Sequence, residues 1–408
     1  MAEALDRTWE IDPGDLKRMI DGEEALFLID VRNREEFARW RIEGRRPLPV
    51  LHVPYFEILA EAELDGAEDE DLVAAIKAYA RGHWTDRLPR DGRIVVVCAH
   101  GGTSRYVAQG LRELGYDAVS LRGGMLAWGD HYEFIPVVEE QDLVVMQISR
   151  PARGCLSYLV ASEGQAVVID PLRHADRYLE FARQRGLTVT RVLDTHAHAD
   201  HISGGAELAA RWGVPYHLHP YDAIHPMDVL PATFRYEPVY DGQAFRVGRA
   251  TLRALHVPGH TLGQVVYLLD DRYLFSGDTI FVESIARPDL GGRAETWTPL
   301  YYRSLRRLAD LPDATLVLPG HFSRPHEADQ RGRVVARLGE LKRSNEGLKA
   351  LEAGERAFFD FIMARLPEFP PQYVDIKRVN TGLLRPSAEQ ATELELGRNV
   401  CALAEEAA

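Results

Sequence analysis

The chain has 408 residues, of which 46% are apolar and 27% charged, which is ordinary for a soluble globular protein but too long for one hydrophobic core. Its net charge of −14 argues against a nucleic-acid partner, and no apolar run could span a membrane. The acidic N-terminus is unlike a secretion signal, and three widely spaced cysteines cannot form a disulfide framework. We therefore expect a cytoplasmic protein of two or three domains.

The first part of the chain alternates strands with helices. Residues 26–30 and 93–98 are short apolar runs typical of buried strands, and residues 104–115 have helical spacing. The acidic segment 57–82 is expected to be a solvated helical insert. Strands that alternate with helices form a parallel sheet, so we predict an α/β domain over residues 1–135.

One cysteine lies in a loop suited to holding a reactive sulfur. Cys98 ends a predicted strand, and a loop with two adjacent glycines separates it from the next helix. Such glycines let backbone N–H groups point at the sulfur, and the helix N-terminus adds partial positive charge, so both favour the thiolate. The loop residues are Ala99, His100, Gly101, Gly102, Thr103 and Ser104. A buried, inert cysteine is the alternative interpretation.

The pattern changes after residues 131–141, which are typical of a linker. Short strands are then expected in antiparallel-looking pairs with helices between them, and the chain after residue 330 is mostly helical. The expected strands are 142–148, 155–161 and 164–170 as a pair, 250–259, and a second pair within 265–278 whose turn consists of Asp270 and Asp271. The expected helices are 174–186, 203–212 and 298–310. This pattern predicts a sandwich of sheets with outer helices over residues 136–330, and a helical extension packed on it over residues 331–408.

Histidines and carboxylates gather at predicted strand ends in this second part. The stretch LDTHAHADH supplies four of them within six positions, and VPGHT, FSGDT and LPGH supply one each after a strand. The seven residues are His196, His198, Asp200, His201, His260, Asp278 and His321. Nitrogen and oxygen ligands without a thiolate suit zinc or iron, and two histidines with one carboxylate suit Fe(II).

In order and spacing, these motifs resemble the metallo-β-lactamase superfamily, with its αβ/βα sandwich, and in particular the glyoxalase II and persulfide dioxygenase branch. For a dinuclear zinc hydrolase, the resemblance implies that all seven residues hold metal, with Asp278 as the bridge. For a persulfide dioxygenase, it implies one Fe(II) per chain on His196, His260 and Asp278, with the other four as a second site or a surrounding shell. The ligand residues alone leave iron and one or two zinc ions open.

A loop after the third metal motif favours sulfur chemistry. ARPDLGG resembles a loop of persulfide dioxygenases, which implies a catalytic role for Arg287. The alternative is a surface loop in which Arg287 only pairs with Asp289. Cys155, at the start of a strand, and Cys401, in a helical tail, are expected to be structural.

A second resemblance concerns the first domain. LIDVRNREEF, the Cys98 loop and LRGGMLAW together resemble a rhodanese domain. Such loops commonly carry arginine where this chain has Thr103, and Arg105 is the candidate substitute. The position that a related phosphatase would fill with arginine holds Ser104, which disfavours a phosphatase.

Together the resemblances imply a persulfide dioxygenase and sulfurtransferase. A low-molecular-weight persulfide such as glutathione persulfide would be oxidised to sulfite with O2, and Cys98 would exchange sulfane sulfur with thiosulfate or sulfite. Two alternatives stay open: a dinuclear zinc thioester hydrolase with an accessory rhodanese domain, and a sulfur-relay or persulfide-sensing module. By analogy, the protein could form a homodimer through residues 331–408.

Overall fold

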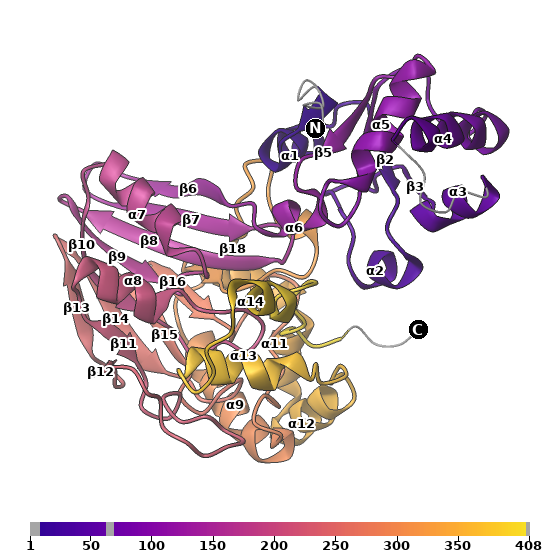
Figure 1. Cartoon of the computed structure of the whole chain (residues 1–408). Helices are drawn as coiled ribbons and strands as arrows, with labels where there is room; N and C mark the ends of the chain where they lie inside the picture. The colour runs from indigo at the N-terminus through magenta and orange to yellow at the C-terminus, as the bar shows by residue number, and fades with distance from the viewer. Residues whose placement is uncertain (1–8, 63–68, 405–408) are drawn as a thin grey trace. The chain divides into compact units, whose positions relative to one another are not determined.

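The computed structural model describes residues 9–62 and 69–404, and the chain divides into two compact units (Figure 1). The first unit ends at His131 and the second begins at Tyr132. The domain limits expected from the sequence, after residues 135 and 330, stay predictions.

The first unit is built on a parallel sheet, as predicted. Its strands follow the order β1-β5-β4-β2-β3, and every neighbouring pair is parallel. The strands are β1 (Glu10–Ile11), β2 (Leu26–Asp30), β3 (Val50–His52), β4 (Arg93–Val97) and β5 (Ala118–Leu121). The helices are α1 (Pro13–Asp21), α2 (Arg34–Arg39), α3 (Tyr55–Glu61), α4 (Asp69–His83), α5 (Thr103–Glu113) and α6 (Gly124–Gly129). β4 buries four of its five residues, as expected of a central parallel strand.

The predicted acidic insert contributes to the core of this unit. Ile76 and Ala80 of α4 are buried with Val107 of α5 and Val96 of β4. The expectation of a merely solvated helix is therefore wrong for α4, because apolar residues recur on one of its faces. Residues 63–68 of the insert lie outside the described residues.

The second unit contains two sheets. One has the strand order β12-β11-β10-β9-β8-β7-β6 and the other β13-β14-β15-β16-β17-β18. The first sheet comprises β6 (Glu133–Glu139), β7 (Val144–Arg150), β8 (Cys155–Ser162), β9 (Gln165–Ile169), β10 (Thr188–Leu193), β11 (Tyr216–Leu218) and β12 (Glu237–Pro238). The second comprises β13 (Ala244–Val247), β14 (Ala250–His256), β15 (Val265–Leu269), β16 (Tyr273–Gly277), β17 (Leu316–Pro319) and β18 (Ala336–Arg337).

Helices cover the outer faces of these sheets. α7 (Ala175–Gln184) and α8 (Gly205–Trp212) lie on the first sheet, and α9 (Ala294–Ala309), α10 (Leu338–Ser344), α11 (Glu346–Ala350) and α12 (Glu355–Met363) lie on the second. α13 (Gln372–Asn380) and α14 (Ala388–Leu394) pack instead on the loops that follow the strands. Tyr178 of α7 packs with Leu159, whereas Tyr301 of α9 and Phe358 of α12 pack with Val266 of the other sheet. The predicted sandwich with outer helices and a helical C-terminal region is confirmed.

Strand β8 illustrates how the layers form. Its residues are all buried, and they alternate between two cores. Leu156 and Tyr158 face the core between the sheets, whereas Cys155 and Leu159 face the core beneath the outer helices. Because successive side chains of a strand point to opposite faces, a strand buried on both sides has a continuous apolar sequence.

The predicted linker at residues 131–141 is wrong. Residues Glu133–Glu139 form β6, which pairs antiparallel with β7 at the edge of the sheet. Pro136 and the glutamates made this segment resemble a linker. An edge strand tolerates proline and charge, because one side of its backbone needs no partner strand.

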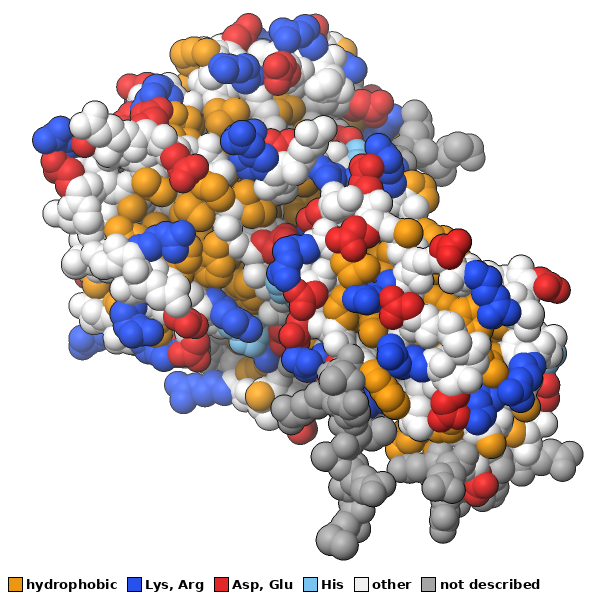
Figure 2. Space-filling view, turned by 90° about the horizontal axis from the view of Figure 1, so that it is seen from above, with side chains coloured by type: hydrophobic (Ala, Val, Ile, Leu, Met, Phe, Trp, Pro, Cys, Tyr) orange, Lys and Arg blue, Asp and Glu red, His pale blue; other side chains and the backbone are white. Residues whose placement is uncertain are grey.

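None of the helices within the described ranges combines the length and hydropathy needed to cross a membrane. Figure 2 shows Lys and Arg side chains intermixed with Asp and Glu side chains on the visible face. That face therefore carries no continuous basic surface of the kind that binds nucleic-acid phosphates.

Candidate metal centre

The seven metal-ligand candidates follow the ends of β10, β14, β16 and β17, and tight turns bring them together. Two glycines of the sequence motifs permit this approach. A Cβ on Gly277 would lie 2.4 Å from Thr195 Oγ1, and a Cβ on Gly320 would lie 2.6 Å from Asp278 Oδ1. Gly277 also has a φ of +48°, a conformation that side chains disfavour. The glycines before Asp278 and His321 are therefore needed for the close packing of the ligand loops.

Three candidate ligand atoms converge without a hydrogen-bond partner. Asp278 Oδ2 lies 3.4 Å from His260 Nε2 and 3.9 Å from His196 Nε2. All three atoms are buried and lack a hydrogen-bond partner. Since a buried polar atom without a partner costs about 1–3 kcal/mol, the group fits an ion that all three would bind.

The other nitrogen of each imidazole is already engaged. His260 Nδ1 lies 2.7 Å from the Arg287 carbonyl and donates to it, while His196 Nδ1 lies 3.0 Å from Thr195 Oγ1. Thr195 Oγ1 in turn donates to Asp170. A proton on each Nδ1 leaves a lone pair on each Nε2 for the ion. Burial lowers the pKa of both histidines, which favours the neutral imidazole that binds metal.

The remaining ligand candidates form an adjacent, internally paired group. His321 Nδ1 lies 2.7 Å from Asp278 Oδ1, and its Nε2 lies 2.8 Å from Asp200 Oδ2. Burial opposes charge on His201, but Asp200 raises its pKa to about 10. His198 lies between the groups, its ring 4.2 Å from that of His196 and 4.3 Å from that of His201. The structure thus brings all seven predicted residues together.

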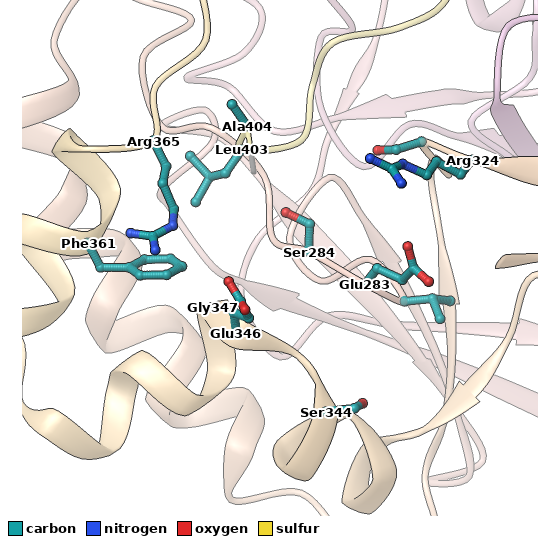
Figure 3. Close-up of a pocket in the computed structure, with 12 residues that line it drawn as sticks. Glu283, Ser284, Arg324, Ser344, Glu346, Gly347, Phe361, Arg365, Leu403 and Ala404 are labelled. Atoms are coloured by element: carbon teal, nitrogen blue, oxygen red, sulfur yellow. The ribbon is translucent and has the colours of Figure 1, made fainter. Parts of the chain in front are cut away.

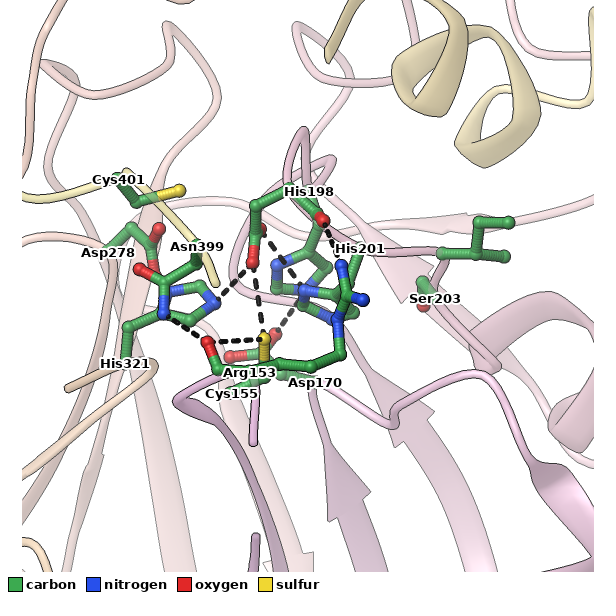
Figure 4. Close-up of polar contacts among 12 residues, drawn as sticks. Arg153, Cys155, Asp170, His198, His201, Ser203, Asp278, His321, Asn399 and Cys401 are labelled. Atoms are coloured by element: carbon green, nitrogen blue, oxygen red, sulfur yellow. Dashed lines mark hydrogen bonds and ion pairs between the residues drawn. The ribbon is translucent and has the colours of Figure 1, made fainter. Parts of the chain in front are cut away.

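Two cysteines that were expected to be structural also reach this group. Cys155 packs in the core, and its thiol donates to Asp200 Oδ2 at 3.3 Å (Figure 4). The Cys401 thiol lies with Asp200, Asp278 and His321, each offering one ligand atom within 4.8 Å of the others. Cys401 is not helical, because α14 ends at Leu394 and an irregular segment carries the cysteine back to the site. Thiol sulfurs therefore lie among the nitrogen and oxygen atoms of the candidate ligand groups.

The guanidinium of Arg287 is buried and fully engaged. It forms a bidentate pair with Asp289, at 2.6 and 2.7 Å, and donates to the carbonyls of Pro367 and Glu368. Its backbone carbonyl holds His260, and its backbone N–H donates to the Cys401 carbonyl. These contacts make Arg287 a brace between the ligand loop and the C-terminal segment. Its catalytic role stays a prediction.

The C-terminal region is tied to the ligand loop by buried polar contacts. Asn380 Nδ2 donates to the carbonyls of His198 and His201, at 2.9 and 2.8 Å. Glu395 accepts from the backbone N–H of Ile202 and pairs with Arg150 and Arg173, both at 3.1 Å. Burial opposes the charge of Glu395, but the arginines lower its pKa to about 2. No motif in the sequence predicted these supports.

The described residues of the second unit line at least two cavities. One of about 250 Å³ borders the ligand loops through Ala197 and Thr261. The other, of about 810 Å³, is lined by polar residues such as Glu283, Ser284 and Arg324 (Figure 3). None of the seven ligand candidates lines either cavity, but the smaller one is lined by direct sequence neighbours of His196 and His260, whereas the larger one is not. The smaller one is therefore the better placed to hold a substrate of the metal centre.

In the first unit, the Cys98 loop folds around the sulfur as predicted. The backbone N–H groups of Gly101 and Ser104 donate to Cys98 Sγ at 3.1 and 3.4 Å, and Ser104 Oγ lies 3.2 Å away. Gly101 has a φ of +83°. Arg105 does not substitute for an arginine of the loop, because it pairs with Glu10 at 2.9 Å. The sulfur thus accepts from two backbone N–H groups and contacts one hydroxyl.

Of the other loop residues, Thr103 begins α5. Ala99, His100 and Gly102 complete the turn between β4 and α5. The Cys98 and Ala99 carbonyls accept from Met125 and Leu126 of α6. The LRGGMLAW segment therefore packs against the start of the loop.

Two family descriptions match the chain. A rhodanese-like domain matches residues 12–131, and the metallo-beta-lactamase superfamily matches residues 150–321. A crystal structure of a metallo-beta-lactamase from Staphylococcus aureus subsp. aureus COL aligns with a TM-score of 0.52 and 29% identity. That alignment covers 61% of this chain and 76% of the other.

Curated relatives match in part or along most of the chain. A hydroxyacylglutathione hydrolase from Xanthomonas euvesicatoria pv. vesicatoria is 38% identical over 163 residues, 40% of this chain and 58% of that protein. This chain thus spans less than two thirds of that relative's length. A beta-lactamase hydrolase-like protein from Xylella fastidiosa is 28% identical over 386 residues, covering 82% of this chain and 86% of the relative.

Proposed function

Since the chain joins a rhodanese-like domain at residues 12–131 to a metallo-β-lactamase domain at residues 150–321, we propose that it is an enzyme of sulfur metabolism. Its second unit oxidises a low-molecular-weight persulfide to sulfite with O2. Its first unit transfers sulfane sulfur through Cys98. The persulfide, for example glutathione persulfide, together with thiosulfate or sulfite and O2, are the proposed small-molecule partners.

The convergence of two imidazoles and one carboxylate carries this proposal. His196 Nε2, His260 Nε2 and Asp278 Oδ2 are the three buried, unpartnered atoms that face one another. Two histidines and a carboxylate with open positions are typical of non-haem Fe(II) oxygenases. Bound there, Fe(II) would supply the redox chemistry by which O2 oxidises the persulfide sulfur.

Hydrogen bonds from neighbouring residues fix the orientation of the two imidazoles and the carboxylate. Thr195 and the Arg287 carbonyl fix the ring orientations of His196 and His260, and His321 holds one oxygen of Asp278 while the other stays available. The net reaction, RSSH + O2 + H2O → RSH + SO3²⁻ + 2 H⁺, moves four electrons from the outer sulfur to O2. Burial of the ligands keeps bulk water from competing.

The first unit uses the donors around Cys98. A Cys98 thiolate attacks the outer sulfur of thiosulfate, forming a Cys98 persulfide and releasing sulfite: Cys–S⁻ + S2O3²⁻ → Cys–S–S⁻ + SO3²⁻. The N–H groups of Gly101 and Ser104 stabilise the anionic sulfur. The reverse reaction consumes sulfite, which is the product proposed for the second unit.

Oxygen uptake by the full chain tests the proposal. We expect anaerobically iron-loaded protein, given glutathione persulfide, to consume O2 and form an equal amount of sulfite at about one iron per chain. The Asp278→Ala variant should lose both iron and oxygen uptake, whereas Cys98→Ser should keep both. An iron-loaded protein that consumes no O2 would refute the oxidation.

A thioester hydrolase is the second candidate, and two observations favour it. A relative matched over the metal-binding region is named a hydroxyacylglutathione hydrolase. In addition, Asp200, His201, His321 and Cys155 form a second group whose ligand atoms lie within 4.8 Å of one another. Two zinc ions per chain with rapid hydrolysis of S-lactoylglutathione would establish this alternative, and the same sample should then take up no O2 with the persulfide.

A further inference from the structure

A buried lysine without a partner faces the cavity beside the metal centre. Lys377 of α13 is only 4% exposed, and among the described residues its ammonium makes neither a hydrogen bond nor an ion pair. Its neighbour Arg378 pairs with Asp228 and Asp375, at 2.7 and 2.8 Å. Burial lowers the pKa of Lys377 even though the carboxylates of Asp222, Asp278 and Asp200 favour its charge, so an anion in the cavity would stabilise the ammonium further.

The fold fixes where this ammonium lies. Lys377 shares the buried face of α13 with Asn380, three residues later. Asn380 is bonded to the carbonyls of His198 and His201 and accepts from the Ser203 N–H. The helix is therefore anchored on the ligand loop, and Lys377 is held one turn from that anchor.

The cavity reached by Lys377 has a volume of about 250 Å³ and is lined by direct sequence neighbours of the candidate ligands His196 and His260. Ala197 lies between two ligand histidines, and Thr261 follows His260. Leu262 and Trp297 add apolar surface, and Arg293 is exposed on the cavity lining. A ligand in this cavity would thus lie next to the metal, with a cation and apolar groups around it.

The carboxylate on the cavity lining is already satisfied. Asp222 Oδ2 accepts from Ala197 N at 2.8 Å and from Thr261 Oγ1 at 2.7 Å, and its Oδ1 accepts from Gly263 N at 2.9 Å. Asp222 therefore braces the ligand loops and does not pair with Lys377. Among the described residues, Arg293 has no ion pair either, so cations outnumber carboxylates on the cavity lining.

We propose that Lys377 binds a carboxylate of the substrate's thiol carrier, so that the second unit selects the persulfide of an acidic thiol over that of a neutral one. This inference rests on the proposed function, because it places the persulfide sulfur at the metal and the carboxylate in the cavity. The apolar walls pack against the methylene groups between them. Lys377 is a specificity-determining residue and takes no part in the bond changes.

Binding without turnover tests this inference separately from the oxidation. S-methylglutathione carries the carboxylates but no thiol to bind metal, and its dimethyl ester lacks both charges. By titration calorimetry on the metal-loaded full chain, we expect the acid to bind about tenfold more tightly than the ester, as a charge-assisted hydrogen bond allows. The Lys377→Met variant should lose this preference, and Lys377→Arg should retain part of it.

A surface-lysine variant and a turnover measurement serve as controls for the role of Lys377. Lys342→Met removes a lysine that pairs with Asp313 at the surface and should leave the preference unchanged. In turnover, Lys377→Met should raise the KM for glutathione persulfide about tenfold with little change in kcat. Equal binding of acid and ester by the unaltered protein would overturn the inference, even if Lys377→Met fails to fold. A persisting preference in a folded Lys377→Met protein would overturn it as well.

Discussion

At the scale of single residues, the histidines of the metal centre differ in what their second nitrogen contacts. His260 donates to a backbone carbonyl, and His196 contacts a hydroxyl that is itself bonded to Asp170. His198 Nε2 lies 3.3 Å from Asp170, while its Nδ1 has no hydrogen-bond partner. Thr195 and Asp170 thus orient His196, whereas Asp170, Asp194 and His198 form a further group that could hold a metal.

We expect Thr195→Val to weaken metal binding by about 10- to 100-fold, because His196 would lose the acceptor that fixes its tautomer. Metal content and a competition titration with a chelator measure this effect. Thr190→Val is the matched control, since Thr190 lies on β10 and bonds to the Ala166 carbonyl away from the ligands. Unchanged metal affinity in Thr195→Val would show that the hydroxyl does not support His196.

In the Cys98 loop, Ser104→Ala removes the hydroxyl that lies 3.2 Å from the sulfur and 2.8 Å from Ser120 Oγ. We expect sulfur transfer from thiosulfate to slow by about tenfold, because a hydrogen bond to an anionic sulfur is lost. The rate of cyanide-dependent thiocyanate formation measures this. Cys98→Ser should abolish the transfer, and iron content should stay the same in both variants. An undiminished rate in Ser104→Ala would contradict the role of the hydroxyl.

At the scale of elements, the sequence predicted most helices and strands of the second unit and missed those that long-range contacts define. The DD turn after β15 is confirmed, with Asp270 and Asp271 at positive φ. The edge strand β6 was missed, because only its pairing with β7 distinguishes it from a linker. The ligand motifs were visible because strand, glycine and ligand are contiguous in sequence.

The supports of the site were not visible in the sequence. Lys377, Asn380, Glu395 and Cys401 lie far along the chain from the first ligand motif, in segments that carry no ligand pattern. Their roles arise from the docking of α13 and of the segment after α14 onto the ligand loops. Only tertiary contacts bring these four residues to the metal centre. Sequence motifs and secondary-structure propensity therefore could not predict their roles.

Glu395 makes this docking depend on pH. Its pKa of about 2 lies below the ordinary value of 4.5, so its pairing with the arginines stabilises the fold above about pH 4.5 and is lost as the pH falls toward 2. We expect Glu395→Gln to lower the free energy of unfolding by on the order of 3 kcal/mol at pH 7. Denaturant titrations at pH 7 and pH 3 should show this difference shrinking. Glu389→Gln, at an exposed position of α14, is the control.

At the scale of the whole molecule, the chain consists of two units with separate cores. The metal ligands belong to the second unit, and Cys98 belongs to the first. A metal that binds only the folded second unit should therefore stabilise that unit alone. The homodimer expected by analogy stays a prediction.

Calorimetry of the full chain checks this separation. We expect two unfolding transitions, of which one moves to lower temperature when a chelator removes the metal. At a free metal concentration about a thousandfold above the dissociation constant, binding contributes roughly 4 kcal/mol to stability. Asp278→Ala should reproduce the shift without a chelator. A single transition, or a shift of both by the same amount, would contradict independent units.

Residues 395–401 return to the metal centre, and this affects when the metal centre can be completed during synthesis of the protein. During translation, Cys401 emerges 205 residues after His196, a delay of roughly 10–40 s at common elongation rates. Throughout that interval the first unit is complete, whereas the nascent second unit lacks Glu395 beneath its ligand loop and Cys401 beside its carboxylates. A metal ion that binds during translation would therefore bind a site that still lacks these two residues. We expect stable metal binding only after the C-terminal residues have been synthesised.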